Sequence, residues 1–223
     1  MKKLLSLFVC AFAALSLQAV TYNWTSLGEK TSNNSSDPGF GITANANKSA
    51  TVAAAITYGA TLNSGVVLSI GVGGRARNIR ALVNSDGTYS LTSGSSTNGS
   101  VTVVTPNVTA QAGKMQVVAL TAYGKGGTIT AALSVDGVVV ATLTSTDDGT
   151  YNKIGWGQVV GGGETNYGDN ATYDVYTYKA DGNAAYLAAS AINKDIRALN
   201  LPEPTALALL ALGIAGVALR RRA

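Results

Sequence analysis

The stretch TITAALSVDGVVVATLT, residues 128–144, indicates the fold class of this chain most directly. Before the pair Asp136-Gly137, apolar side chains alternate with smaller or polar ones, and a period of two puts the apolar set on the core face of a strand. Asp136 and Gly137 suit a two-residue hairpin turn because both tolerate positive φ. The stretch therefore predicts two antiparallel strands, 128–135 and 138–144, joined by a tight turn.

Eight further segments between residues 51 and 179 are short, rich in β-branched or aromatic residues, and separated by Gly, Asn, Asp and Ser. Ten strands and almost no helix predict an all-β fold, an antiparallel β-sandwich or jelly roll. In the segment 172–179 aromatic residues fall on both sides of the alternation, which predicts a strand whose two faces both have a role. The eight ranges are 51–58, 66–72, 79–83, 88–92, 100–105, 115–123, 153–156 and 172–179.

Residues 115–188 resemble the concanavalin A-like and laminin G-like (LamG) sandwich superfamily. The resemblance rests on the strand 117–121, the Gly127 turn, the Val135-Asp136-Gly137 hairpin, the block 153–155 and the closing strand 173–178. It implies a jelly-roll sandwich domain, which we expect to span residues 20–182. Residues 22–50 align with no part of the superfamily pattern.

Residues 183–200 are rich in alanine, with apolar residues at helical spacing. They predict a helix that packs on the sandwich or spaces it from a membrane, and we treat 183–201 as a helical spacer. The alternative is an amphipathic helix that binds a partner. The apolar positions are Ala185, Ala188, Ala189, Ile192, Ile196 and Leu199.

The first 19 residues have the three parts of a secretory signal peptide: Lys2 and Lys3, a short apolar run, and small residues near Ala19. The run has roughly 12 residues, whereas a bilayer needs about 20. We therefore expect removal after about Ala19 rather than anchoring. A lipoprotein site at Cys10 is disfavoured because bulky residues precede it.

The other end carries Pro202-Glu203-Pro204, an apolar run over 205–219, and Arg220-Arg221-Arg222. Cations after an apolar helix hold it in a membrane with its charges inside, and they argue against a buried terminal helix. A short transmembrane anchor is the alternative. Residues 202–223 resemble the bacterial PEP-CTERM sorting signal, which implies an exosortase-type processing enzyme, membrane contact through the C-terminal helix before processing, and a Gram-negative-type envelope rich in exopolysaccharide. We expect an exported protein at the cell surface or in the extracellular matrix.

The charge of the chain lies mainly in these terminal segments. Five of the 16 lysines and arginines fall there, so the body has 11 basic and 11 acidic residues. A nucleic-acid site needs a basic face, and the only local cluster is Arg75, Arg77 and Arg80. We interpret that cluster as solvated surface and expect no nucleic-acid partner.

The residue types present exclude most catalytic chemistry. The chain has no histidine, and its single cysteine lies in the leader, so Ser-His-Asp and Cys-His systems, His-ligated zinc and disulfides are all ruled out. Glucan-cleaving members of the superfamily carry a Glu-x-Asp-x-x-Glu strand motif, which is missing here. Catalysis by Glu164 with Asp169 or Asp174 is a weak alternative, and we predict a protein that is not an enzyme.

Calcium is the one cofactor that the residue types leave open, because oxygen ligands from loops suffice. Asp147, Asp148, Glu164 and Asp169 are the candidate ligands. Superfamily members often carry calcium at a sandwich rim. Ordinary turns and solvated loop acids explain the same residues, so we otherwise expect no cofactor.

Sugar binding is the leading functional hypothesis. Aromatic rings stack on pyranose faces and amides read hydroxyls, and the loop 155–170 offers Trp156, Tyr167, Asn166 and Asp169. The alternatives are a purely structural surface protein and, more weakly, a glycan-active enzyme. An exposed Trp156 beside a groove would favour the binder, and a buried Trp156 would favour the structural protein.

Overall fold

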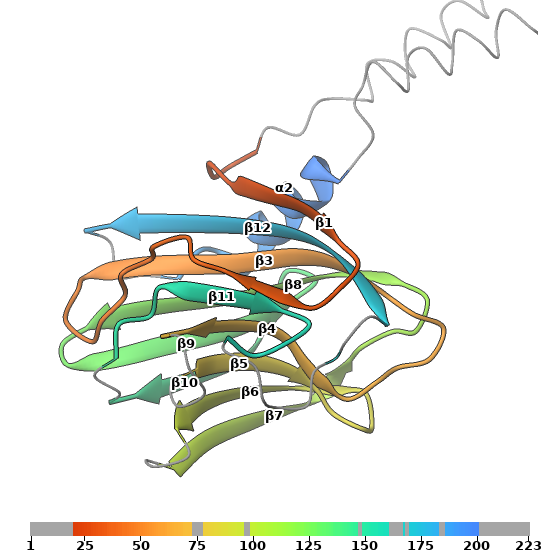
Figure 1. The fold of residues 1–223 in the computed structure, drawn as a ribbon, viewed down its shortest axis with the longest axis horizontal. Coiled ribbons are helices and arrows are strands. Elements are labelled where there is room, and N and C mark those ends of the chain that lie inside the picture. The colour runs from red at the N-terminus through yellow and green to blue at the C-terminus, as the bar shows by residue number, and fades with distance from the viewer. Residues whose placement is uncertain are drawn as a thin grey trace, which may run out of the picture.

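A computed structural model describes residues 20–72, 78–95, 99–146, 149–160, 167, 170–182 and 186–200. The described chain folds into two six-stranded antiparallel sheets packed face to face, with one short helix near its C-terminal end (Figure 1). The all-β antiparallel sandwich predicted from the sequence is therefore confirmed. The predicted leader and the predicted sorting signal lie outside the described residues.

Sheet A has the strand order β1-β12-β3-β8-β9-β10, and every neighbouring pair is antiparallel. The Asp136-Gly137 turn joins β9 to β10 as predicted, with φ of 48° and 88°. The strands are β1 (Thr25–Lys30), β3 (Lys48–Tyr58), β8 (Met115–Lys125), β9 (Thr128–Val135), β10 (Val138–Ser145) and β12 (Ala171–Asp181).

Sheet B has the order β2-β11-β4-β5-β6-β7. One edge strand of each sheet, β1 in sheet A and β2 in sheet B, comes from residues 22–50, for which the sequence predicted no strand. The strands of sheet B are β2 (Asn34–Ser36), β4 (Gly65–Gly71), β5 (Asn78–Val83), β6 (Thr88–Ser95), β7 (Gly99–Thr109) and β11 (Lys153–Trp156).

The main core lies between the two sheets. It is built from the inward sides of strands that alternate at period two, so its aliphatic residues come from nearly every strand. Several tyrosines are also fully buried, and two of them share a hydrogen bond, Tyr58 Oη to Tyr89 Oη at 2.7 Å. The largest fully buried side chains include Tyr58, Tyr89, Tyr151, Tyr167, Tyr173, Ile56, Leu68 and Leu120.

A second apolar cluster lies on the outer face of sheet A, beneath helix α2 (Ala189–Leu199). Ile192 and Ile196 of α2 contact small residues of β3 and β8, so the helix packs on the sandwich rather than standing away from it. No helix among the described residues is long and apolar enough to span a bilayer, and 205–219, where the sequence predicts one, lies outside them. The buried members of the cluster are Ala53, Ala55, Val117, Ala119, Tyr176, Ile192 and Ile196.

The N-terminal residues 20–24, which we call the N-terminal strap, run beside α2. Thr21 N and Tyr22 N donate hydrogen bonds to the Asp195 carboxylate at 2.7 and 2.9 Å, and Trp24 Nε1 donates to it at 3.0 Å. The two ends of the described body therefore lie side by side, as Figure 1 shows for the red N-terminal segment and the blue helix.

Candidate functional site

The two aromatic residues predicted to stack on a sugar lie in the core. Trp156 is 4% exposed and Tyr167 is 1% exposed. Trp156 Nε1 donates to the Ser32 carbonyl oxygen at 3.1 Å, and the Tyr167 ring contacts that of Tyr58 edge-on at a centroid distance of 5.4 Å. A stacking platform needs an accessible ring face, so these residues do not form one in this structure. Asn166 and Asp169 lie outside the described residues.

The burial of Trp156 follows from its strand position. Trp156 and Ile154 are two residues apart on β11, so both face the sheet interior, with Gly155 between them on the outer face. In the register of β11 with β4, Trp156 lies opposite the buried Leu68. The residue belongs to the end of a strand and not to an exposed loop.

The predicted calcium ligands cannot be placed. Asp147, Asp148, Glu164 and Asp169 all lie outside the described residues. Within the described part of the chain, no group of three or more His, Cys, Asp or Glu side chains could hold a metal ion. Calcium binding therefore stays a prediction.

Arg80 and Asp174, which the sequence predicts to be solvated residues, are less exposed than expected. Arg80 is 9% exposed on β5, opposite Ser69 and Thr92, so it is not the solvated surface residue that we expected. Asp174 lies opposite Glu29 across β12 and β1. Burial and the neighbouring Glu29 charge raise the pKa of Asp174. Arg75, Arg77 and Glu164 lie outside the described residues.

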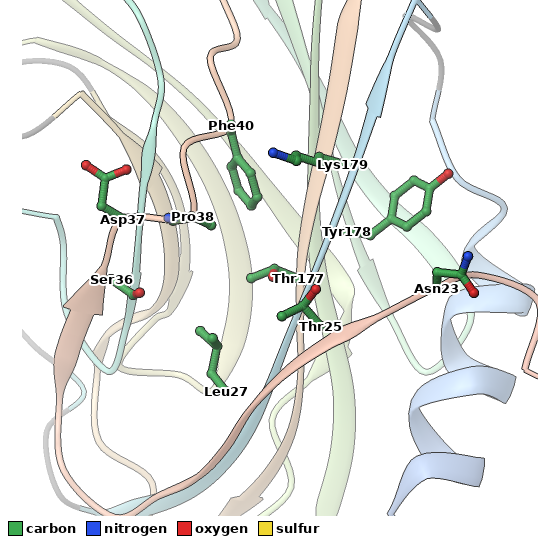
Figure 2. A pocket seen from close by; sticks show the side chains of 10 residues that line it. All are labelled: Asn23, Thr25, Leu27, Ser36, Asp37, Pro38, Phe40, Thr177, Tyr178 and Lys179. Carbon is green, nitrogen blue, oxygen red and sulfur yellow. The ribbon is translucent and has the colours of Figure 1, made fainter.

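An open groove lies at the edge of the sandwich, between β1 and β12 of sheet A and the segment that follows β2 of sheet B (Figure 2). We call it the edge groove. Its volume is about 400 Å³, within the range of roughly 300 to 1,000 Å³ that small-molecule sites occupy. It is lined by Asn23, Thr25, Leu27, Ser36, Asp37, Pro38, Phe40, Thr177, Tyr178 and Lys179.

The two walls of the edge groove carry opposite charges. Asp37 stands on the β2 side and Lys179 on the β12 side, and both side chains are exposed (Figure 2). Asp37 Oδ1 accepts a hydrogen bond from Gly39 N at 3.0 Å. Within the described part of the chain, neither Asp37 nor Lys179 forms an ion pair. A carboxylate acceptor and an ammonium donor therefore remain available to a ligand.

The apolar part of the edge groove comes from Leu27, Pro38 and the buried Phe40. Tyr178 also lines the groove, but its ring points away from Asp37 in Figure 2 and packs against Tyr22 at a centroid distance of 5.3 Å. The described lining of the groove thus combines polar and charged side chains with a somewhat larger share of apolar surface.

Sequence reasoning missed the edge groove because most of its residues come from the unassigned segment 22–50. One signal was present. The alternation in β12 puts Thr177 and Lys179 on the side opposite Tyr176 and Tyr178. The same side carries Tyr173 and Val175 of the main core, so the groove lies at the end of the core face of β12, while Tyr176 lies in the second apolar cluster on the other face.

Several solved structures are similar to this chain at low sequence identity. They include the CBM40 of the Ruminococcus gnavus IT-sialidase bound to α2,3-sialyllactose, with 14% identity, 74% of this chain and 94% of that chain covered, and a TM-score of 0.48. Domain 4 of AbnA, a GH43 extracellular arabinanase from Geobacillus stearothermophilus, in complex with arabinotriose, has 14% identity, coverage of 77% and 87%, and a TM-score of 0.46. The heptameric SAP-like pentraxin from Limulus polyphemus has 15% identity, coverage of 73% and 81%, and a TM-score of 0.43. The sugars named here belong to those proteins and are not carried over to this chain.

Comparison with curated protein sequences gives no match. Comparison with protein families identifies the PEP-CTERM protein-sorting motif at residues 200–222. This confirms the sorting signal predicted from Pro202-Glu203-Pro204 and the terminal arginines. The motif implies processing by an exosortase at the membrane, and it marks the protein as exported to the cell surface.

Proposed function

We propose that this exported surface protein binds carbohydrate through the edge groove and does not act on it as an enzyme. The observation that carries the proposal is the groove itself, an open site of about 400 Å³ whose described lining residues offer an exposed carboxylate, an exposed ammonium, hydroxyl groups and apolar side chains. Sugars offer hydroxyls on their rims and apolar C–H faces, so they match a lining of both kinds.

The polar lining supplies both hydrogen-bonding roles that a sugar needs. The Lys179 ammonium donates only, the Asp37 carboxylate accepts only, and the Thr25 hydroxyl does both. Charge-assisted hydrogen bonds are about twice as strong as neutral ones, so we expect Asp37 and Lys179 to contribute most to binding. Leu27 and Pro38 would contact the C–H face of the sugar.

The site of export supports a polysaccharide partner. A sorting motif at residues 200–222 delivers the chain to the cell surface, where exopolysaccharide and other envelope glycans are the abundant polymers. The wider assignment that we propose is a concanavalin A-like, LamG-like sandwich with a signal peptide removed after about Ala19. The central hairpin and the two antiparallel sheets support that assignment.

The proposal of a binding rather than a catalytic site rests on the acids in the groove. Glycoside hydrolysis uses two carboxyl groups placed about 5 to 9.5 Å apart, and the lining residues that the structure describes include a single one, Asp37. Glu29 and Asp174 are neighbours in the strand register but neither lines the groove.

A structural surface protein without a discrete ligand is the second candidate. The burial of Trp156 and Tyr167 favours it, because these rings stabilise the core instead of contacting a sugar. The two candidates differ in whether the edge groove has a saturable ligand.

Glycan-array binding by the purified body, residues 20–200, decides between them. The protein is also tested against purified exopolysaccharide, with and without calcium. Saturable binding that Lys179→Ala or Asp37→Ala abolishes, and that Lys114→Ala retains, supports the binder. Lys114 is an exposed lysine outside the groove, so it controls for charge. Binding that all three variants retain would place the ligand elsewhere, and no binding under any condition would favour the structural protein.

A further inference from the structure

Asp195 is a buried carboxylate in an apolar setting. It lies on the inner side of α2 next to Ile196, and it is 0% exposed. Its oxygen atoms accept hydrogen bonds from two backbone N–H groups and one indole N–H of the N-terminal strap. All three donors are neutral. Burying a charge is costly unless an opposite charge or enough hydrogen bonds compensate it.

The described residues provide no cationic side chain in ion-pair contact with Asp195. The two charged groups nearest to it in α2 are directed elsewhere: Lys194 is exposed, and Arg197 pairs with Asp136 at 2.7 Å. The aromatic residues beside the strap, Tyr22 and Tyr178, have no basic group and so provide no positive charge. The negative charge of Asp195 therefore has hydrogen bonds but no counter-charge in the described chain.

The chain can create a counter-charge at one place near Asp195. The sequence predicts removal of the leader after about Ala19, which would turn the Val20 amide nitrogen into an α-ammonium. Thr21 N lies 2.7 Å from Asp195 Oδ1, and consecutive backbone nitrogens are at most about 3.7 Å apart. The ammonium would thus lie within about 6.5 Å of the carboxylate. Val20 is 41% exposed and Asp195 is 0% exposed, so water screens the attraction only from the Val20 side.

We propose that the α-ammonium group of Val20, released when the leader is cut, is the counter-ion of the buried Asp195 and completes the docking of α2. Cleavage hydrolyses the peptide bond between Ala19 and Val20, so the new amine takes up a proton at neutral pH while a carboxylate leaves with the leader. In the uncut precursor Val20 N is a neutral amide, and Asp195 lacks this counter-charge.

Removal of the leader would in this way affect the start of the C-terminal sorting motif. The sorting motif begins at residue 200, directly after the last residue of α2, Leu199. A firmly docked α2 fixes the point where the sorting segment leaves the sandwich. Cutting the N-terminal leader therefore stabilises the helix from which the C-terminal segment is processed.

The first test is the N-terminal residue of the exported protein, read by mass spectrometry. Val20 as first residue is expected. Any first residue other than Val20 overturns the proposal, because the positive charge next to Asp195 would then not belong to Val20.

The second test measures the charge interaction itself in the chain from Val20 to Ala223, held in detergent. The pKa of the Val20 α-amino group is measured by NMR, and we expect it above the ordinary range of about 7.7 to 8.0. Asp195→Asn keeps a hydrogen-bond acceptor and removes the charge, so it should return this pKa to the ordinary range. An ordinary pKa that Asp195→Asn does not change would overturn the proposal.

A third measurement keeps every residue unchanged. Acetylation of the Val20 amine removes the positive charge and leaves the strap hydrogen bonds in place. We expect amide hydrogen exchange in α2 to become at least several-fold faster, with exchange in the central strand β3 unchanged. Equal exchange in the acetylated and free proteins would show that the ammonium does not contribute to α2 docking.

Discussion

The two faces of strand β12 differ in how fully other parts of the chain cover them. On one side Tyr176 and Tyr178 lie under α2 and the N-terminal strap, where the second apolar cluster is covered. On the other side Thr177 and Lys179 line the edge groove, which stays open. The C-terminal half of this strand thus supplies Tyr176 and Tyr178 to a packed face, and Thr177 and Lys179 to a candidate binding site. The packed face should control stability, and the groove should control binding.

The largest effect on this comparison is expected from Ile196→Ala. Ile196 is 0% exposed between α2 and sheet A, and truncating a buried isoleucine costs about 2 to 4 kcal/mol. Urea unfolding followed by circular dichroism and by tryptophan fluorescence measures the loss. Lys194→Ala, on the exposed side of the same helix, is the matched control. A loss no larger than that of the control would mean that α2 is not packed as described.

Asp195→Ala should have the next largest effect, about 2 kcal/mol, because it leaves three donors of the strap without their acceptor. Burial raises the pKa of Asp195, but the hydrogen bonds from Thr21, Trp24 and Tyr22 outweigh it and leave the pKa below its usual value. A lowered pKa in the folded state means that the ionised carboxylate stabilises the fold above the ordinary Asp pKa of about 3.9.

The role of the Asp195 carboxylate can be checked from how the stability difference between the native protein and Asp195→Ala depends on pH. The stability gap between the native protein and Asp195→Ala should be full at pH 7 and shrink as the pH falls through the lowered folded-state pKa. Urea unfolding from pH 7 down to pH 3 follows the gap. A gap that widens on acidification would contradict the assigned role of the carboxylate.

Arg197→Ala should cost less, up to about 1 kcal/mol, since its ion pair with Asp136 is partly exposed. Arg197 Nε also donates to Asn193 Oδ1 at 2.9 Å, and Asp136 keeps its bond from Val117 N without Arg197. Thermal unfolding at low and high salt measures the effect, which screening should reduce. A salt-independent loss would show that packing of the side chain, and not the ion pair, stabilises the helix.

The smallest effect on stability is expected from Lys179→Ala in the edge groove. The side chain is exposed and forms no ion pair in the described chain, so the unfolding free energy should change by less than about 0.5 kcal/mol. Carbohydrate binding should nevertheless be lost. A large stability loss in this variant would show that the groove residues are structural, and it would remove the contrast between the two regions.

Much of the fold could be predicted from the sequence because the strands of the sandwich alternate clearly and end at turn residues. The strands 128–135 and 153–156 have the bounds expected, and Asp136-Gly137 forms the expected turn. Strand β1 was missed because its only large apolar residue is Leu27 and it pairs on one side alone. Edge strands of this kind carry little hydrophobic pattern.

The candidate site was less predictable for a different reason. The edge groove is assembled from residues 23–27, 36–40 and 177–179, which meet only because β1 pairs with β12 and β2 pairs with β11. Such non-local pairing leaves no local signal. Trp156, in contrast, could have been assigned to the core from its spacing of two from Ile154.

An NMR titration of the ¹⁵N-labelled body, residues 20–200, with oligosaccharides from purified exopolysaccharide tests the central claim most directly. The account predicts saturable shifts of the backbone amides of Thr25, Asp37 and Lys179, with the α2 amides unchanged. Shifts confined to other surfaces, or no shift at saturating sugar, would contradict a carbohydrate site in the edge groove.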